Sequence, residues 1–223
     1  MNWFKVKIIS IHIPKTGGRT FRSILEDQYS EAETLYMLRE EVDQALLDNS
    51  MTLSDLSNVE ALHGHFMFHE IESLWRSSNA RLITWLRDPI QRVVSNHRFF
   101  IKRLNDGPAT QNDIHRLNLH RKDESLLTYA EMEENRNVIT KFTKGAGLDD
   151  FYFIGFLEEY GEGIRSLSKK LGWNVKKVPR VNDNSDFKKK MGPISSKEEQ
   201  LLREWNSEDI EFYQEAREKW KHA

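Results

Sequence analysis

The chain has 223 residues, which is enough for one α/β domain with a buried core. Its 33 Lys and Arg residues nearly balance 35 Asp and Glu residues, and a net charge of -2 gives no global attraction to nucleic acid or anionic lipid, so any anion site must be local. The absence of cysteine excludes disulfides, thiolate metal sites and thiol catalysis, and it fits a reducing compartment, of which the cytoplasm is the default expectation.

The N-terminal part of the chain predicts a strand followed by two helices. A dense run of apolar and β-branched residues over 6–13 predicts a buried strand, and a loop follows at 14–18. Apolar positions at helical spacing predict helices over 21–28 and 35–47. No secretory signal precedes the first strand and no run of about 18 apolar residues occurs, so we expect a soluble chain without a membrane span.

The middle of the chain predicts a strand, a turn and a long helix. Arg81–Leu86 is an apolar run, after which Asp88 supplies an N-cap and Pro89 a first-turn proline for a helix that continues to about residue 104. The polar stretch 105–124 is rich in Asn, Asp, His and Arg, and it is long enough to predict a functional loop. We interpret it as an acceptor or lid loop.

Helical and strand patterns alternate again in the last third. A helix is predicted over 125–144, ending at Gly145, and an aromatic and β-branched run predicts a strand over 151–157. Another helix is expected over 158–171, with Gly172 as its C-cap.

The C-terminal part begins with a basic, irregular segment over 176–191. A helical segment over 195–222 follows, and it starts at a serine with a glutamate three residues later, as in a capping box. Strands that alternate with helices predict a single domain over residues 1–223, an α/β fold of P-loop-like, three-layer architecture in which a central, mainly parallel sheet is flanked by helices. Ligands of such sheets bind beyond the carboxyl ends of the strands.

The segment HIPKTGGRT at 12–20 follows a predicted strand and opens a helix. This arrangement directs backbone N–H groups and the helix dipole at an anion, and the two adjacent glycines allow a close approach. Lys15 adds a positive charge, and the hydroxyls of Thr16 and Thr20 can donate to phosphate or sulfate oxygens. The loop is not a Walker A loop, whose lysine follows the final glycine. A plain Gly-Gly turn without a ligand is the alternative.

A second candidate anion site lies in the segment RDPIQRVVS at 87–95. Arg87 stands at a strand end and Ser95 lies two turns inside the next helix, where it can share a surface with Arg92. Arginine suits phosphate because its planar guanidinium makes bidentate, charge-assisted bonds. A capped surface helix is the simpler interpretation of this segment alone. Two such sites at strand ends of one parallel sheet, however, match an adenosine nucleotide that carries phosphates at both ends.

These two segments resemble the 5′-phosphosulfate and 3′-phosphate motifs of sulfotransferases that depend on 3′-phosphoadenosine 5′-phosphosulfate (PAPS). The likeness extends to the carbohydrate branch that includes heparan sulfate 2-O-sulfotransferases, through LHGH at 62–65 and FIGFLEE at 153–159. The resemblance implies a metal-independent enzyme that transfers a sulfuryl group from PAPS to a hydroxyl of a carbohydrate-like acceptor. The second product would be adenosine 3′,5′-bisphosphate (PAP).

The resemblance also implies a role for each motif residue. Lys15 would stabilise the leaving phosphate, and Arg87 with Ser95 would bind the 3′-phosphate. The residues that would hold the 5′-phosphosulfate are Lys15, Thr16, Gly17, Gly18, Arg19 and Thr20. The chain departs from the family pattern at Arg19, where a small or hydroxyl residue is common, and at His97, where a tyrosine is common.

Sulfuryl transfer needs a base for the acceptor proton, and histidine has a suitable unperturbed pKa. The HGH triplet supplies His63 and His65, whose side chains face the same side in an extended segment. The family likeness favours His65 as the base, with His63 as an orienting neighbour or as the base itself. The same spacing occurs at metal sites, but a zinc site without cysteine would need a third ligand such as His69, and we expect no metal.

Two basic stretches could contact an anionic acceptor, although solvated surface is the simpler interpretation of both. They contain His115, Arg116, His120, Arg121 and Lys122, and Lys176, Lys177, Arg180, Lys188, Lys189 and Lys190. Two other functions stay open, namely a kinase-like phosphotransferase, which would need magnesium and a nucleoside triphosphate, and a non-catalytic nucleotide-binding module. The sequence leaves the oligomeric state undetermined.

Overall fold

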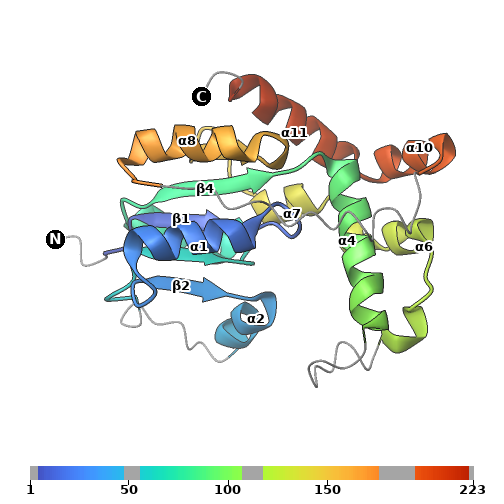
Figure 1. The fold of residues 1–223 in the computed structure, drawn as a ribbon, viewed down its shortest axis with the longest axis horizontal. Coiled ribbons are helices and arrows are strands. Elements are labelled where there is room, and N and C mark those ends of the chain that lie inside the picture. The colour runs from blue at the N-terminus through green and yellow to red at the C-terminus, as the bar shows by residue number, and fades with distance from the viewer. Residues whose placement is uncertain (1–4, 48–55, 107–117, 176–193, 221–223) are drawn as a thin grey trace.

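A computed structural model describes residues 5–47, 56–106, 118–175 and 194–220 of the chain. Its centre is a five-stranded sheet with the strand order β2-β3-β1-β4-β5, and every pairing is parallel (Figure 1). The strands are β1 (Ile8–Ile11), β2 (Thr34–Met37), β3 (Ala61–Gly64), β4 (Arg81–Leu86) and β5 (Phe151–Phe156). The predicted fold class, a P-loop-like α/β architecture with a central parallel sheet, is confirmed.

Helices connect the strands and follow the last one. They are α1 (Gly18–Tyr29), α2 (Arg39–Leu47), α3 (Phe68–Ser77), α4 (Pro89–Asn105), α6 (Leu126–Glu131), α7 (Val138–Thr143), α8 (Tyr160–Leu171), α10 (Ser196–Trp205) and α11 (Ser207–Lys219), with short 3-10 helices η1 (Leu119–Arg121), η2 (Glu133–Asn135) and η3 (Leu157–Glu159). Within the described ranges, none of the helices is both long enough and apolar enough to cross a membrane.

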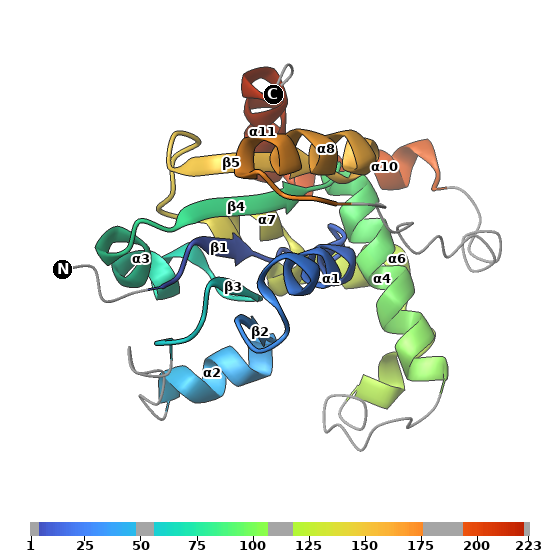
Figure 2. The ribbon, with the colours of Figure 1, turned by 60° about the vertical axis from the view of Figure 1, so that its left-hand side comes forward.

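The sheet is covered by helices on both faces. Successive residues of a strand point to opposite faces, and in β1 the side chains of Ile8 and Ile9 belong to two different buried clusters. The cluster around Ile9 includes side chains of α3, α7 and α11, whereas the cluster around Ile8 includes side chains of α1 and α8. Figures 1 and 2 show α1 and α8 on one face of the sheet and α7 on the other.

The strand order determines where a ligand can bind. The chain leaves β1 toward β2 and leaves β4 toward β5, so the connections after these two neighbouring strands run in opposite directions. Such a switch point opens a crevice at the carboxyl edge of a parallel sheet, which is where ligands of these folds bind. The loop after β1 and the loop after β4 therefore border the same crevice.

Several local signals in the sequence correspond to the observed structure. The Asp88 side chain accepts a hydrogen bond from the Gln91 N–H at 2.9 Å and starts α4. Gly172 has a φ of 70° and ends α8. Ser195 and Glu198 form a capping box at the start of α10. Each of these signals lies within a few residues of the structure that it determines.

The predictions of one continuous helix over 35–47 and of another over 125–144 are wrong, because each range contains several elements. The range 35–47 contains strand β2, the residue Leu38 and then helix α2, because β2 pairs with β3 at the edge of the sheet. The range 125–144 is divided into α6, η2 and α7, and Asn137 takes a left-handed φ of 45° between them. The sequence interpretation also missed β3. The basic segment 176–191 lies outside the described residues.

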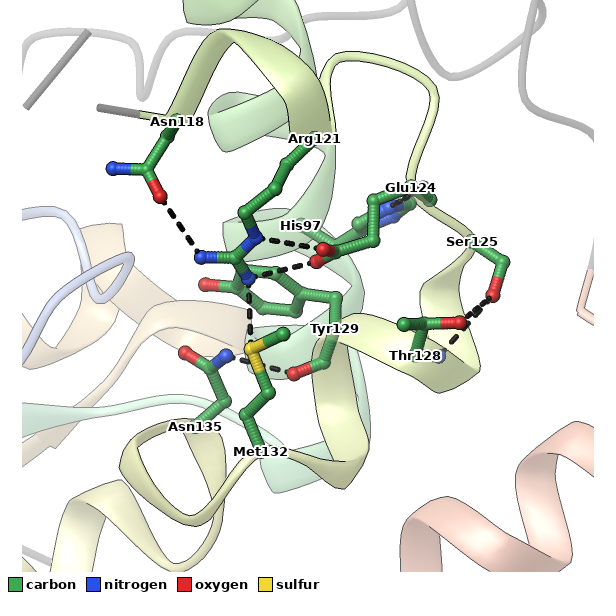
Figure 3. A network of polar contacts seen from close by, with 9 residues as sticks. All are labelled: His97, Asn118, Arg121, Glu124, Ser125, Thr128, Tyr129, Met132 and Asn135. Carbon is green, nitrogen blue, oxygen red and sulfur yellow. Dashed lines mark hydrogen bonds and ion pairs between the residues drawn. The ribbon is translucent and has the colours of Figure 1, made fainter. Parts of the chain in front are cut away.

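The described end of the stretch 105–124 is attached to α4 (Figure 3). The Arg121 guanidinium donates to both carboxylate oxygens of Glu124 at 2.6 and 2.8 Å. The His97 ring of α4 lies 2.8 Å from the Glu124 carbonyl oxygen through its Nε2 atom. Asn118 contributes a further acceptor for Arg121 at 3.1 Å. Arg121 is thus engaged within the chain, and residues 107–117 lie outside the described part.

Helix α11 is anchored to α7 through Asp209. This carboxylate is fully buried, and it accepts the N–H groups of Ile139 at 2.9 Å and Thr140 at 2.8 Å in the first turn of α7. The side chain of Asn206 accepts the N–H of Asn137 at 3.2 Å. The C-terminal helices thereby cap a helix that packs beneath the sheet.

We expect Asp209→Ala to lower the free energy of unfolding by about 2–4 kcal/mol, because two N–H groups in a buried setting lose their acceptor. Urea unfolding followed by circular dichroism measures the change. Glu208→Ala, at the exposed neighbouring position, is the matched control and should change the value by less than about 0.5 kcal/mol. Equal losses in the two variants would contradict the capping role.

Candidate active site

The loop after β1 turns the chain so that α1 begins at the carboxyl edge of the sheet. Lys15 and Gly17 take left-handed φ values of 74° and 93°, and α1 starts at Gly18. The Thr16 hydroxyl donates to the Ile13 carbonyl oxygen at 2.8 Å and closes the loop. The N-cap residue, Gly17, has no side chain that could cap this helix, so the first N–H groups and the positive end of the helix dipole are directed at the crevice.

The His12 ring lies so close to residue 18 that only glycine fits there. A Cβ atom at Gly18 would lie 1.9 Å from Nε2 of His12, so the helix can approach the imidazole only without a side chain. The His12 ring stacks on His65 at 4.1 Å and on His63 at 5.0 Å between ring centroids. Burial, together with neighbouring His63, holds the pKa of His12 well below 6.5, so this imidazole is neutral at pH 7.

A pocket of about 450 Å³ lies in the crevice. Residues from β2 and from α1, α2 and α4 border it, together with the loops that follow β1 and β4. The predicted site residues that border the pocket are Lys15, Gly17, Gly18, Arg19, Thr20, His65, Arg87 and Ser95. The two anion motifs and the favoured base therefore surround one cavity, although they lie up to 80 positions apart in the sequence (residues 15 and 95).

Thr16 and His63 are not among the residues that border this pocket. Both are 1% exposed, and both are held by contacts beneath the loop. The His63 ring lies 3.0 Å from the Ser10 hydroxyl oxygen and 3.2 Å from the Gly18 carbonyl oxygen. Burial lowers the pKa of His63 to about 3, so its imidazole stays neutral. The geometry fits a role in supporting the start of α1.

Lys15 is half-buried at the pocket, and its Nζ atom lies 4.1 Å from the centroid of the Phe99 ring. Burial lowers the pKa of Lys15 to about 8, and the positive charges of Arg19 and Arg87 contribute. A guanidinium nitrogen of Arg87 lies 3.5 Å from the Lys15 carbonyl oxygen, which joins the two loops. The charges of Lys15, Arg19 and Arg87 repel one another, and an anion in the pocket would reduce this repulsion.

His65 is the histidine of the HGH triplet that borders the pocket. Burial lowers its pKa below 6.5, and therefore the neutral imidazole predominates at pH 7. A neutral imidazole can accept a proton from a hydroxyl group.

The sequence analysis missed residues on two walls of the pocket. Tyr36 comes from β2, Arg39 and Glu40 come from α2, and Leu38 lies between these elements, which the single predicted helix concealed. Asn96, Phe99 and Arg103 come from α4. Helical spacing from Ser95 could have identified Phe99 and Arg103, because residues four apart lie on one face of a helix. His97, also on α4, is buried against Tyr129 with a ring distance of 5.3 Å.

The model of the sulfotransferase family matches residues 5–221. The chain belongs to the sulfotransferase family. The predicted enzyme class, a PAPS-dependent sulfotransferase, is thereby confirmed, and the carbohydrate branch stays a prediction. No curated protein is similar enough in sequence to count as a match.

Three solved structures show similarity to this chain. Mouse sulfotransferase SULT7A1, complexed with PAP, is 15% identical with a TM-score of 0.50, covering 98% of this chain and 89% of the mouse chain. The sulfotransferase from Alicyclobacillus acidocaldarius is 12% identical with a TM-score of 0.44, covering 92% of each chain. Retinol dehydratase, in complex with androsterone and PAP, is 14% identical with a TM-score of 0.37. The match covers 90% of this chain and 64% of the retinol dehydratase chain. The mouse structure supports the fold assignment.

In this sulfotransferase the charge of Lys15 should make anion binding dependent on pH. Lys15 is charged below its pKa of about 8 and neutral above it. We expect the affinity for PAP to fall by roughly tenfold as the pH rises from about 7 to about 9, because binding favours the charged lysine. Isothermal titration calorimetry at several pH values measures this change.

Lys15→Arg provides the control for this titration, because arginine keeps its charge over the whole range. Its affinity for PAP should be nearly independent of pH. The same decrease in the arginine variant would assign the titration to another group.

Proposed function

We propose that this sulfotransferase transfers a sulfuryl group from PAPS to a hydroxyl of a carbohydrate-like acceptor, with His65 as the base and Lys15 beside the leaving phosphate. One observation carries the proposal. Lys15, Arg87 and His65 border a single pocket at the switch point of the sheet. The pocket thus combines two anion-binding elements with a neutral imidazole.

The two anion-binding elements would hold opposite ends of the nucleotide. The N-terminus of α1, with Arg19 and Thr20, would bind the 5′-phosphosulfate through N–H groups, a guanidinium and a hydroxyl. Arg87 and Ser95 would bind the 3′-phosphate. The PAP complex of the mouse sulfotransferase, which has a similar fold, supports a nucleotide of this kind. Thr16 would act indirectly, by closing the loop through its bond to the backbone.

The reaction would proceed by in-line displacement at sulfur. The acceptor oxygen forms a bond to sulfur while the bond from sulfur to the bridging phosphate oxygen breaks, and PAP leaves with the bridging oxygen. His65 takes the hydroxyl proton, since its imidazole is neutral at pH 7. The Lys15 ammonium stabilises the negative charge that develops on the bridging oxygen.

The pocket walls favour a ring-shaped acceptor with anionic groups. Leu38 and Phe99 border the pocket and are 44% and 40% exposed, so they offer apolar surface on two walls. Arg103, one turn beyond Phe99, is exposed and adds a positive charge. Such surfaces suit the apolar face and the carboxylate or sulfate groups of an acidic sugar.

Radiolabelled transfer from PAPS over a panel of saccharides, phenols and tyrosyl peptides tests the function. We expect labelled saccharides, with His65→Ala lowering the rate by about 10²–10⁴-fold and Lys15→Ala by about 10²–10³-fold. His69→Ala, at an exposed position of α3 that does not border the pocket, is the matched control and should keep the wild-type rate. Label only in phenols or peptides would overturn the acceptor class, and full activity in either pocket variant would reject the role of that residue.

The phosphotransferase alternative predicts a different ligand preference. PAP should raise the melting temperature of the chain, whereas ATP with magnesium should raise it less at the same concentration, because Arg87 and Ser95 suit a 3′-phosphate that ATP lacks. Differential scanning fluorimetry measures both shifts. Arg87→Ala should reduce the PAP shift toward the ATP value. Stabilisation by ATP and magnesium alone would favour a phosphotransferase.

A further inference from the structure

Arg39, the first residue of α2, borders the pocket, but its guanidinium is directed at groups of the chain itself. Its Nη1 atom donates to a Glu70 carboxylate oxygen at 2.8 Å and to the His65 carbonyl oxygen at 3.1 Å. Its Nη2 atom donates to the other Glu70 oxygen at 2.6 Å and also to Asp43. Its Nε atom donates to Asp43 at 2.9 Å.

These contacts use the full donor capacity of the side chain, because a guanidinium has five N–H groups. Arg39 therefore has no N–H group left for an anionic ligand while these contacts hold. Its charge is also balanced by two carboxylates, and the Glu70 hydrogen bond raises the pKa of Arg39 further above its ordinary value. Arg39 thus differs from Arg19 and Arg103, which border the same pocket and are exposed.

The contacts of Arg39 complete the attachment of His65. Strand β3 ends at Gly64, so His65 is the first residue beyond the regular sheet. Its N–H group donates to the Met37 carbonyl oxygen at 2.9 Å, and its carbonyl oxygen accepts from Arg39. Both main-chain groups of His65 are thus held by the segment that contains β2 and the start of α2.

Glu70 holds the other side of this arrangement. Its side chain is only 9% exposed, and one of its oxygens also accepts the Met67 N–H at 2.6 Å. The carboxylate therefore connects the start of α3 to the guanidinium that holds the His65 carbonyl. The short segment between β3 and α3 is therefore held at His65 by Met37 and Arg39, and at Met67 by Glu70. These hydrogen bonds limit how far the His65 ring can move.

We infer that Arg39 is a positioning residue for His65, oriented by Glu70, and that it does not bind the acceptor. The inference rests on the proposed function, in which His65 is the base. Proton transfer requires the base within hydrogen-bond distance of the hydroxyl, and a displacement of about 1 Å can lower a rate by roughly 100-fold. Removing the guanidinium leaves the His65 carbonyl without its donor and frees Glu70 from its ion pair.

Steady-state kinetics with Arg39→Met separates the two roles. The assay uses PAPS and a glucuronic-acid oligosaccharide as the probe acceptor. We expect kcat to fall about 100-fold, while KM for PAPS and the PAP-induced rise in melting temperature stay within about twofold. A rise in KM for the oligosaccharide at unchanged kcat would assign Arg39 to acceptor binding and overturn the inference.

Two further variants keep the test decisive. Glu70→Gln keeps the shape of the side chain and should lower kcat by about tenfold, which tests the same arrangement if Arg39→Met does not fold. Arg76→Met removes a 59% exposed arginine that pairs with Glu72 on α3, and it should leave kcat unchanged. Wild-type kcat in a folded Glu70→Gln or Arg39→Met variant would overturn the inference.

A readout without any acceptor is the titration of His65 by NMR of ring-labelled histidine, assigned with His65→Gln. Arg39→Met should move the His65 pKa toward 6.5, because a loosened ring gains water and because the Arg39 charge, which lowers this pKa, is removed. Glu70→Gln keeps the Arg39 charge, and it should move the His65 pKa in the same direction through the gain of water alone. An unchanged His65 titration in that variant would contradict a positioning role. Full transfer activity in His65→Ala would instead reject the proposed base, whereas an inactive His65→Ala beside a fully active Arg39→Met would reject this inference alone.

Discussion

The pairing of β1 with β4 is the constraint on which the site depends. The hydrogen-bonded ladder fixes two neighbouring strands whose connections leave in opposite directions, so the loop with Lys15 and the loop with Arg87 end side by side. The contact of Arg87 with the Lys15 carbonyl oxygen is a consequence of this pairing. Because the ladder holds both strands, Lys15 and Arg87 stay close together without a ligand. This preorganisation lowers the entropy that is lost when a nucleotide binds.

The pocket concentrates positive charge in a chain whose net charge is only -2. Lys15, Arg19, Arg87 and Arg103 all border it, and the low pKa of Lys15 reflects both burial and the neighbouring arginines. A local cluster of this kind attracts an anion although the whole molecule does not. The net charge alone therefore says little about the ligand, whereas the distribution of charge indicates it.

The rings of His63 and His65 both stack on His12, and the three side chains differ in their surroundings. His63 is fully buried and supports the start of α1, and His12 packs against Gly18 so closely that only glycine fits there. His65 reaches the pocket, where Arg39 and Met37 hold its main chain. All three are neutral at pH 7 because burial lowers each pKa, so charge does not distinguish them. His12 and His65 border the pocket, whereas His63 does not.

Local patterns in the sequence were enough to predict the features that depend on nearby residues. The glycine loop at the start of α1, the Asp88 cap of α4 and the α/β class all follow from patterns within a few positions, because caps, turns and periodicity are local. The position of β2, the separation of His63 from the pocket that His65 borders, and the contacts of Arg39 with Glu70 emerge only from the folded chain. They depend on pairing and burial between segments that are distant in the chain, such as β2 beside β3 and Arg39 beside Glu70, and no local pattern encodes which distant groups will meet.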